Sequence, residues 1–202
     1  MSAFPQIYLA SRSPRRRELL AQIGVTYQML LLREHTDRGA DINEDVLPGE
    51  SPETYVRRVC EIKAVSSWRR VTERKLVQYP VLAADTTVCI DGEILVKPAD
   101  QDDARRMLRL LSGREHRVLS AVAVQFGETR VLDVSDSLVR FRHISDEEIA
   151  GYIASGEPMG KAGAYAIQGR AAEFVANLNG SYSGVMGLPL YETAALLRKI
   201  RQ

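Results

Sequence analysis

Two long stretches of alternating polarity lie next to each other in the middle of the chain. One covers residues 116–126 and the other 129–143, and only a Gly-Glu dipeptide separates them. Apolar Val122 and Val124 alternate with smaller or polar residues, which is the pattern of half-buried antiparallel strands. Strands and helices alternate upstream of this hairpin, so it interrupts a doubly wound pattern and predicts a mixed sheet.

The rest of the chain carries the start and stop signals of short strands and helices. Expected strands cover 7–10, 25–32, 81–90, 93–96 and 174–175, and expected helices cover 14–23, 52–70, 101–111, 146–155 and a terminal stretch from 189. No linker, repeat or low-complexity tract divides the 202 residues. We therefore expect a single α/β domain over 1–202, with helices flanking a mixed sheet.

Composition narrows the class of protein. With 45% hydrophobic and 26% charged residues the chain is expected to fold, and a net charge of +1 provides no basic field for a stable nucleic-acid partner. Cys60 and Cys89 have no disulfide or metal spacing and are expected to be buried thiols. The sequence has no secretory signal and no apolar window of about 18 residues, so we expect a cytoplasmic protein without a membrane segment.

The segment 11–17, Ser-Arg-Ser-Pro-Arg-Arg-Arg, joins the first strand to the first helix. Ser13 is a good N-cap and Pro14 suits the first helical position. Arg15 and Arg16 then fall in the first turn, where cations oppose the helix dipole unless an anion is bound there. Free N–H groups, hydroxyls and guanidinium groups at a helix start suit a phosphate chain. The alternative is an ordinary basic, solvated helix start.

Asp85 interrupts the apolar strand 81–90. An ionised carboxylate buried without partners is very costly, so we expect Asp85 to be paired, metal-bound, hydrogen-bonded or at an open strand end. A structural role is the alternative to a functional one. Asp85 and Thr86 would point to opposite faces of a regular strand, so we expect the strand to end or bulge there if both serve one ligand.

Two lysines are candidates to pair with this carboxylate. Lys63 follows Val59 by four residues, which turns its ammonium group toward the interior, although a lysine whose head reaches solvent has the same spacing. The Asp-Gly hairpin at 91–92 folds Lys97 back toward Asp85, which makes an ion pair possible. Glu34, in the acidic segment 33–50, is the candidate ligand for Mg²⁺.

The stretch 160–169 combines glycines, small residues, a lysine and the amide of Gln168. It lacks the spacing of a Walker loop. Close backbone approach and an amide that both donates and accepts suit base recognition by Gln168, and a tight packing turn is the alternative. Trp68 is expected to pack against the fold, and no histidine shows metal or triad spacing.

Taken together, these stretches make the chain resemble the Maf family of nucleoside triphosphate pyrophosphatases, also called septum formation inhibitor Maf-like proteins. The resemblance spans Ile7 to about Leu197. The matching motifs are Ser-Arg-Ser-Pro-Arg-Arg at 11–16, Glu-Ile-Lys-Ala at 61–64, Ala-Asp-Thr at 84–86, Lys-Pro at 97–98, Lys-Ala-Gly-Ala-Tyr at 161–165 and Ile-Gln-Gly at 167–169. Arg12 stands where Gly or Ala is frequent, and the 33–50 segment is longer than in compact members.

This resemblance implies a two-lobed α/β fold of the Maf/ITPase-like kind, with a long curved mixed sheet. It also implies a Mg²⁺ or Mn²⁺ requirement, a possible homodimer, and hydrolysis of a nucleoside triphosphate to monophosphate and pyrophosphate. Asp85 would be the proton acceptor and, with Glu34, a metal ligand. The positions that match base selection are Arg15, Thr86 and Gln168, and those that match phosphate binding or catalysis are Ser11, Arg16, Lys63 and Lys97.

Arg15, Thr86 and Ile167-Gln168 look like the subgroup that acts on dTTP and UTP. Within the family, the alternative is the subgroup that acts on 7-methyl-GTP. An alternative from another class is a nucleotide-binding regulator of cell division that needs no turnover.

Overall fold

The computed structural model describes residues 4–32 and 42–200 and contains one seven-stranded mixed sheet. Its strands are β1 (Ile7–Leu9), β2 (Tyr27–Met29), β3 (Val81–Ile90), β4 (Glu93–Leu95), β5 (Glu115–Phe126), β6 (Thr129–Phe141) and β7 (Val175–Asn179). The order is β2-β1-β3-β5-β6-β7, and β4 also pairs with β3. The β1 pairings are parallel and all the others are antiparallel, so the predicted mixed sheet is confirmed.

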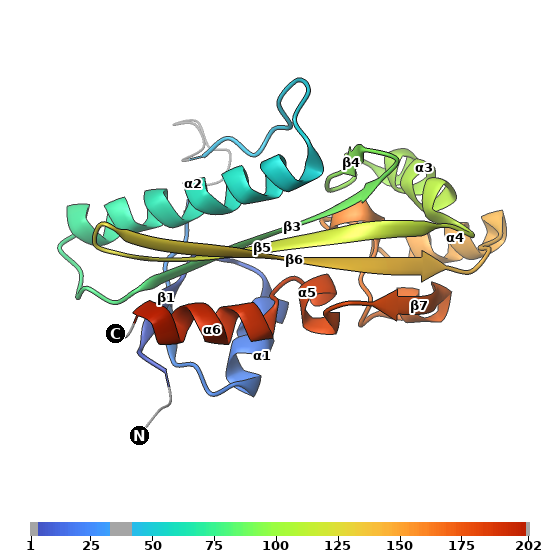
Figure 1. Ribbon diagram of the computed structural model, residues 1–202. Helices are drawn as coiled ribbons and strands as arrows, with labels where there is room; N and C mark the ends of the chain where they lie inside the picture. Colours follow the sequence, from blue (N-terminus) through green and yellow to red (C-terminus); the bar gives the residue numbers. More distant parts are fainter. Residues whose placement is uncertain (1–3, 33–41, 201–202) are drawn as a thin grey trace.

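Helices cover both faces of this sheet (Figure 1). They are α1 (Pro14–Gln22), α2 (Pro52–Glu73), α3 (Gln101–Leu111), α4 (Asp146–Ala154), α5 (Tyr182–Met186) and α6 (Leu190–Ile200), with 3-10 turns η1 (Ala162–Ala164) and η2 (Arg170–Phe174). Helix α2 packs on one face of the sheet, α1 and α6 lie on the other, and α3 and α4 lie at the far end of the long strands. The expected α/β architecture, a mixed sheet flanked by helices, is confirmed.

At most helix starts a side chain caps the first turn. Ser51 Oγ accepts a hydrogen bond from the Thr54 amide, and Asp100 accepts from the Asp103 amide. At α4 the complete capping box of Ser145 and Glu148 is present. These bonds satisfy amide groups that a helix leaves unpaired at its first turn.

Helix α1 departs from that pattern. Ser13 is its N-cap residue, but its side chain makes no capping hydrogen bond. Instead, the Ser13 amide donates to Ser11 Oγ at 3.1 Å. Ser13 therefore occupies the predicted N-cap position, with Pro14 at the first helical position, but the hydroxyl of Ser11 makes the hydrogen bond of this turn in its place.

Three other local expectations also differ from the structure. The second strand is shorter than predicted, β6 ends at Phe141, and the short helix α5 is absent from the predicted elements. At the end of β6 the register with β7 shifts between Arg140 and Phe141. Helix α5 has only five residues, too few for a visible apolar period, and it begins where Ser181 Oγ accepts the Gly184 amide.

The edge of β3 that faces β1 is unpaired over a short stretch. Strand β1 pairs with β3 only at Val81 and Leu82, and β4 pairs with it only from Val88 onward. Between these contacts lie Asp85 and Thr86, which remain paired with β5 along the opposite edge. We call this interval the β3 edge gap. It leaves the middle of a central strand accessible from the side.

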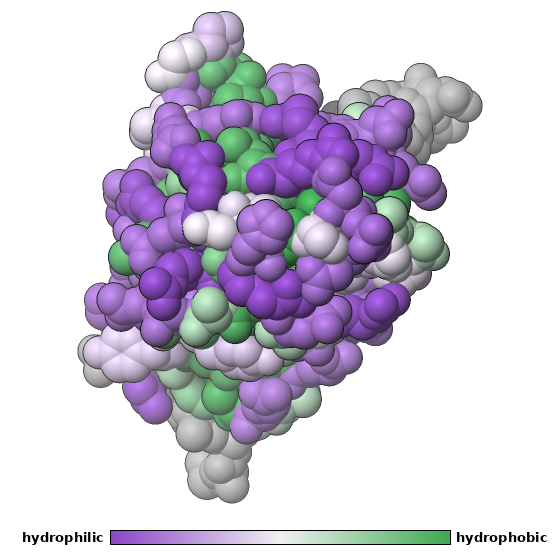
Figure 2. Space-filling view, turned by 90° about the vertical axis from the view of Figure 1, so that its right-hand side faces the viewer, coloured by the Kyte–Doolittle hydropathy of each residue, from purple (hydrophilic) through white to green (hydrophobic). Residues whose placement is uncertain are grey.

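The polarity of the surface and the packing of the aromatic and cysteine side chains are those of a folded chain. The end that carries α3 and α4 is mainly hydrophilic, with small separated hydrophobic areas (Figure 2). Trp68 packs edge-to-face on Phe126, and Cys60 and Cys89 are buried free thiols, as predicted. Within the described ranges, none of the helices is long and apolar enough to cross a membrane.

Candidate active site

A buried ion pair lies at the β3 edge gap. Lys63 Nζ, from the middle of α2, donates to Asp85 Oδ1 at 2.7 Å. The two side chains are 13% and 11% exposed. Burial lowers the pKa of Lys63, but the negative charges of Asp85 and Glu44 outweigh it and the pKa stands above its ordinary value. Lys63 is therefore an ammonium ion held against a carboxylate, which is the inward one of the two directions that its helical spacing allowed.

A second carboxylate, that of Glu44, reaches the same ammonium group. Glu44 Oε1 lies 3.2 Å from Lys63 Nζ. Glu44 also influences Arg16 electrostatically, so the pair and the first helix share one charged neighbourhood. The candidate ligand chosen from the sequence, Glu34, lies outside the described residues.

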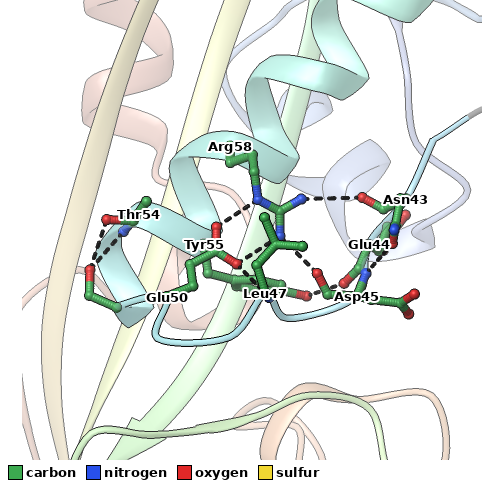
Figure 3. Close-up of polar contacts among 9 residues, drawn as sticks. Asn43, Glu44, Asp45, Leu47, Glu50, Thr54, Tyr55 and Arg58 are labelled. Carbon is green, nitrogen blue, oxygen red and sulfur yellow. Dashed lines mark hydrogen bonds and ion pairs between the residues drawn. The ribbon is translucent and has the colours of Figure 1, made fainter.

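The segment that carries Glu44 is fastened to the start of α2 (Figure 3). Arg58 holds the Glu50 carboxylate through Nε at 2.6 Å and donates to the carbonyl oxygen of Asp45 at 2.8 Å. The Tyr55 hydroxyl donates to the carbonyl oxygen of Glu44 at 3.0 Å. Burial raises the pKa of Tyr55, with Asp85 and Glu44 adding to the effect, so it stays a neutral donor. These bonds fix where the Glu44 carboxylate points.

The segment 11–17 forms the turn next to this pair. Arg16 donates from Nε to the carbonyl oxygen of Gly187 at 2.8 Å and from Nη1 to Ser11 Oγ at 3.2 Å. Burial lowers the pKa of Arg16, while Asp85 opposes that shift. The charges of Asp85 and Glu44 act on both Arg16 and Lys63, so the two cations lie in one charged neighbourhood.

Thr86 lies on the other face of β3. Its Oγ1 is 2.8 Å from Ser120 Oγ, and the register pairs Thr86 directly with Ser120. A Cβ added at Gly187 would lie 3.9 Å from both Thr86 Oγ1 and Arg16 Nε, so Gly187 lies beside both groups. The strand neither ends nor bulges at Asp85, contrary to the condition inferred from the sequence. Asp85 and Thr86 therefore point to opposite faces of an unbroken strand.

A further group of polar residues surrounds Arg15. Burial lowers the pKa of half-buried Arg15, and Glu18 and Glu157 raise it in part. Lys161 has a lowered pKa, caused first by burial and then by the charge of Arg15. Glu157 accepts from the Arg170 amide at 3.1 Å, so it holds the turn that carries exposed Gln168. Glu157 thus links half-buried Arg15 and Lys161 with the turn that carries Gln168.

Lys97 follows β4 and is exposed. Within the described part of the chain no acidic group pairs with Lys97 at ion-pair distance, so Asp85 is neutralised by Lys63 and not by Lys97. Lys97 lies just beyond the end of β4 that borders the β3 edge gap, and Ser11 lies just beyond the end of β1 on the other side. The two residues flank the gap.

The donor set suits a hard cation only in part. Nowhere in residues 4–32 and 42–200 do three or more His, Cys, Asp or Glu side chains cluster closely enough to hold a metal. Asp85 and Glu44 provide two carboxylates, and Mg²⁺ commonly binds through one or two carboxylates plus substrate phosphates. The site therefore fits Mg²⁺ or Mn²⁺ arriving with a phosphate ligand.

Cys60 lies near the pair but offers no nucleophile. Its Sγ is 3.5 Å from the carbonyl oxygen of Ala83. Burial, reinforced by Asp85, raises the pKa of the Cys60 thiol to about 12. It therefore stays protonated and acts as packing.

Comparison with known proteins identifies the family. The model of the Maf-like protein family matches residues 6–200. This chain belongs to the Maf family. All the Maf motif residues from Ser11 to Gln168 lie within that match, which confirms the resemblance found in the sequence.

Curated Maf relatives cover the same length. The chain is 60% identical to a dTTP/UTP pyrophosphatase of Ralstonia nicotianae over 96% of this chain and 93% of that protein. It is 57% identical to one of Nitrosomonas europaea, with coverage of 96% and 93%, and 58% identical to one of Cupriavidus metallidurans, with coverage of 96% of both chains. The solved Staphylococcus aureus Ham1 protein matches at TM-score 0.41 and 13% identity over 70% of this chain and 72% of that one, too distant for any argument.

Several residues of this Maf site were not found from the sequence. Glu44 was visible only as one acid among several in its segment, and nothing in a single sequence told it apart from Glu34. Ser120 and Gly187 approach Thr86 through strand register and through α5, which a linear pattern does not reveal. A hydroxyl within the apolar run 118–124 was the one usable signal for Ser120.

Proposed function

We propose that this chain hydrolyses dTTP and UTP to the nucleoside monophosphate and pyrophosphate. The family and the names of its close relatives support the reaction class and the substrates. The observation that carries the proposal is the buried contact of Lys63 Nζ with Asp85 Oδ1 at the β3 edge gap, with Glu44 beside it.

Cleavage of a phosphoanhydride needs neutralisation of oxygen charge and a positioned water. We expect the water oxygen to attack the α-phosphorus while the bond from that phosphorus to the bridging oxygen breaks and pyrophosphate leaves. Asp85 accepts the proton of the water, since a carboxylate at the open strand edge has the required reach. Arg16, Lys63 and exposed Lys97 supply positive charge for the phosphate oxygens, and Ser11 orients Arg16.

Asp85 and Glu44 are the described residues that would hold a divalent metal ion, Mg²⁺ or Mn²⁺. When bound, the metal supplies further positive charge to the phosphate oxygens. Glu34 stays a candidate ligand from the sequence alone.

Base choice is assigned to the groups around the Thr86 side of the strand. Arg15, Thr86 and the amide of Gln168 are the proposed selecting residues. Arg15 is half-buried and Gln168 is exposed, and Glu157 links them, since it acts electrostatically on Arg15 and accepts from the Arg170 amide just after Gln168, which supports this assignment.

The decisive variant is Asp85→Asn, measured as pyrophosphate release from UTP and dTTP with Mg²⁺. Loss of the proton acceptor is expected to lower kcat by about 10²- to 10⁴-fold. Asp133→Asn on exposed β6 makes the same chemical change away from the site and should keep wild-type kcat. An Asp85→Asn enzyme near wild-type kcat would show that Asp85 is not the base.

Two alternatives to this function each have their own test. Faster release from 7-methyl-GTP than from UTP would assign the chain to the methylated-GTP subgroup. Cellular effects on division that persist in Asp85→Asn with nucleotide binding intact would favour a regulator without turnover.

A cytoplasmic location and a homodimer remain predictions, and sedimentation analysis of the purified chain tests the homodimer.

A further inference from the structure

Three polar groups form a row that begins at Thr86 and continues through Ser120 to the backbone of Gly184. Thr86 Oγ1 lies 2.8 Å from Ser120 Oγ, and Ser120 Oγ donates to the carbonyl oxygen of Gly184 at 2.6 Å. Ser120 is 1% exposed and Thr86 is partly exposed. The row therefore runs from the site into the interior.

The direction of these bonds follows from proton counting. A carbonyl oxygen can only accept, so the single proton of Ser120 is committed to Gly184. Ser120 Oγ must then accept from Thr86, and the single proton of Thr86 is committed to Ser120. Thr86 Oγ1 offers only lone pairs to any other group. Thr86 therefore donates to Ser120, and toward a ligand it can act only as a hydrogen-bond acceptor.

The inner end of the row is held firmly. The Gly184 amide donates to Ser181 Oγ at 3.0 Å, which fixes the first turn of α5. A Cβ at Gly184 would lie 3.1 Å from Ser181 Cβ and 3.3 Å from Ser135 Oγ, so the surroundings are close on both sides. The carbonyl of Gly184 therefore cannot turn away easily.

We propose that Ser120 is a positioning residue that fixes Thr86 as an acceptor for the N3–H of thymine or uracil. The proposal rests on the proposed function and deepens it. Thymine and uracil both carry a proton on N3, whereas N3 of cytosine is an acceptor. A cytosine base would face Thr86 with acceptor against acceptor and leave both groups unpaired.

Arg15 and Gln168 can supply the hydrogen-bond donors that the rest of such a base needs. A base with N3–H has a carbonyl oxygen on each side of that nitrogen. Arg15 can only donate, and the Gln168 amide can donate as well. The set can thus place donors against the two carbonyl oxygens and the Thr86 acceptor against N3–H, which matches thymine and uracil.

The test is the ratio of kcat/KM for UTP to that for CTP, measured by pyrophosphate release with Mg²⁺. In Ser120→Ala the Thr86 hydroxyl loses its acceptor and can turn its proton toward N3 of cytosine. We expect the UTP/CTP ratio to fall about tenfold or more. Ser120→Cys, which is nearly isosteric but accepts poorly, should also lower the ratio. Ser67→Ala removes another fully buried hydroxyl, on α2, and should leave the ratio unchanged.

A merely structural role of Ser120 would lower kcat/KM equally on both nucleotides, and an unchanged ratio in folded Ser120→Ala overturns the proposal. Recognition of a sugar hydroxyl by Thr86 would give that same unchanged ratio. If Ser120→Ala does not fold, Thr86→Val must abolish the preference and Thr86→Ser must keep it. A wild-type enzyme that cleaves UTP and CTP equally refutes the inference alone, whereas one that cleaves neither UTP nor dTTP refutes the proposed function itself.

Discussion

Lys63 and Lys97 carry the same charge in different surroundings, and the difference decides what each contributes. Lys63 is buried against Asp85 and Glu44, whereas Lys97 is exposed. Removing one partner of a buried ion pair leaves the other unneutralised and is strongly destabilising. Removing an exposed cation seldom changes stability. Lys63 should therefore matter for folding as well as for chemistry.

We predict that Lys63→Met lowers the free energy of unfolding by about 3 kcal/mol. Urea unfolding of the variant and of the wild type measures this loss. Because the loss comes from unpaired carboxylates, Lys63→Met with Asp85→Asn should recover part of it. Lys97→Met is the matched control and should stay within about 0.5 kcal/mol of wild type while still lowering UTP turnover. Equal destabilisation by the two lysine changes would contradict this reading.

The pH range of the pair follows from the raised pKa of Lys63. Its stabilisation is fully present below the ordinary lysine pKa of 10.5 and is lost only as the pH rises through the higher folded pKa. Assays at neutral pH therefore always measure the protein with Lys63 in its charged form.

Of the site residues, those within regular elements were the most predictable. The spacing of Lys63 on one helix allowed its inward direction, and the cost of burying a lone carboxylate indicated that Asp85 has a partner. Glu44 and Ser120 were not predictable, because their approach depends on the path of a loop and on the pairing of distant strands. Those relations are set by tertiary packing.

At the scale of elements, the turn between α4 and β7 depends on glycine backbone geometry. Gly163 lies in η1 with φ of +65°, and a Cβ there would come within 2.8 Å of the Val88 side chain. Its amide donates to the carbonyl oxygen of Val96 at 3.3 Å. The turn therefore packs directly on β3 and on the segment leading to Lys97.

Gly163→Ala is expected to lower the free energy of unfolding by about 2 to 4 kcal/mol, the sum of left-handed strain and overpacking against Val88. Gly160 provides a matched control, because its φ is +72° but a Cβ there meets nothing within 4 Å. Gly160→Ala should cost only about 1 kcal/mol. Thermal or urea unfolding of both variants tests the difference, and equal losses would mean that the Val88 contact is relieved without cost.

The elements themselves were largely predicted from patterns and caps. The long hairpin, α2 and the α4 capping box follow from local rules that no distant contact overrides. Helix α5 was missed because a five-residue helix has no period of its own and depends on Ser181 and on Gly187, whose φ is +118°. The shortness of β2 likewise reflects how far β1 extends to pair with it.

For the whole molecule, acid sensitivity is expected from one buried histidine. His116 is 2% exposed, its Nε2 lies 2.9 Å from the Tyr165 hydroxyl, and its Nδ1 has no hydrogen-bond partner among the described residues. Burial lowers the pKa of His116 to about 4. Below its ordinary pKa of 6.5 the unfolded chain takes up a proton that the folded chain refuses, so stability falls with decreasing pH.

We predict a loss of about 2 kcal/mol from His116 between pH 6.5 and pH 5, levelling off below about pH 4. Urea unfolding of wild type and His116→Gln over this range isolates the histidine, since other groups titrate in both. His143→Gln, at an exposed histidine, should retain the wild-type pH dependence. Parallel curves for wild type and His116→Gln would exclude His116 as the source.

The β3 edge gap has a consequence for how such a protein can diversify. Adjacent residues of one uninterrupted strand carry Asp85 to the α2 side and Thr86 to the α5 side. Under the proposed function, bond cleavage and the choice of nucleotide would then depend on opposite faces of one strand. Substitutions around Ser120 are in that case expected to change which base is accepted without altering the Lys63–Asp85 pair on the other face.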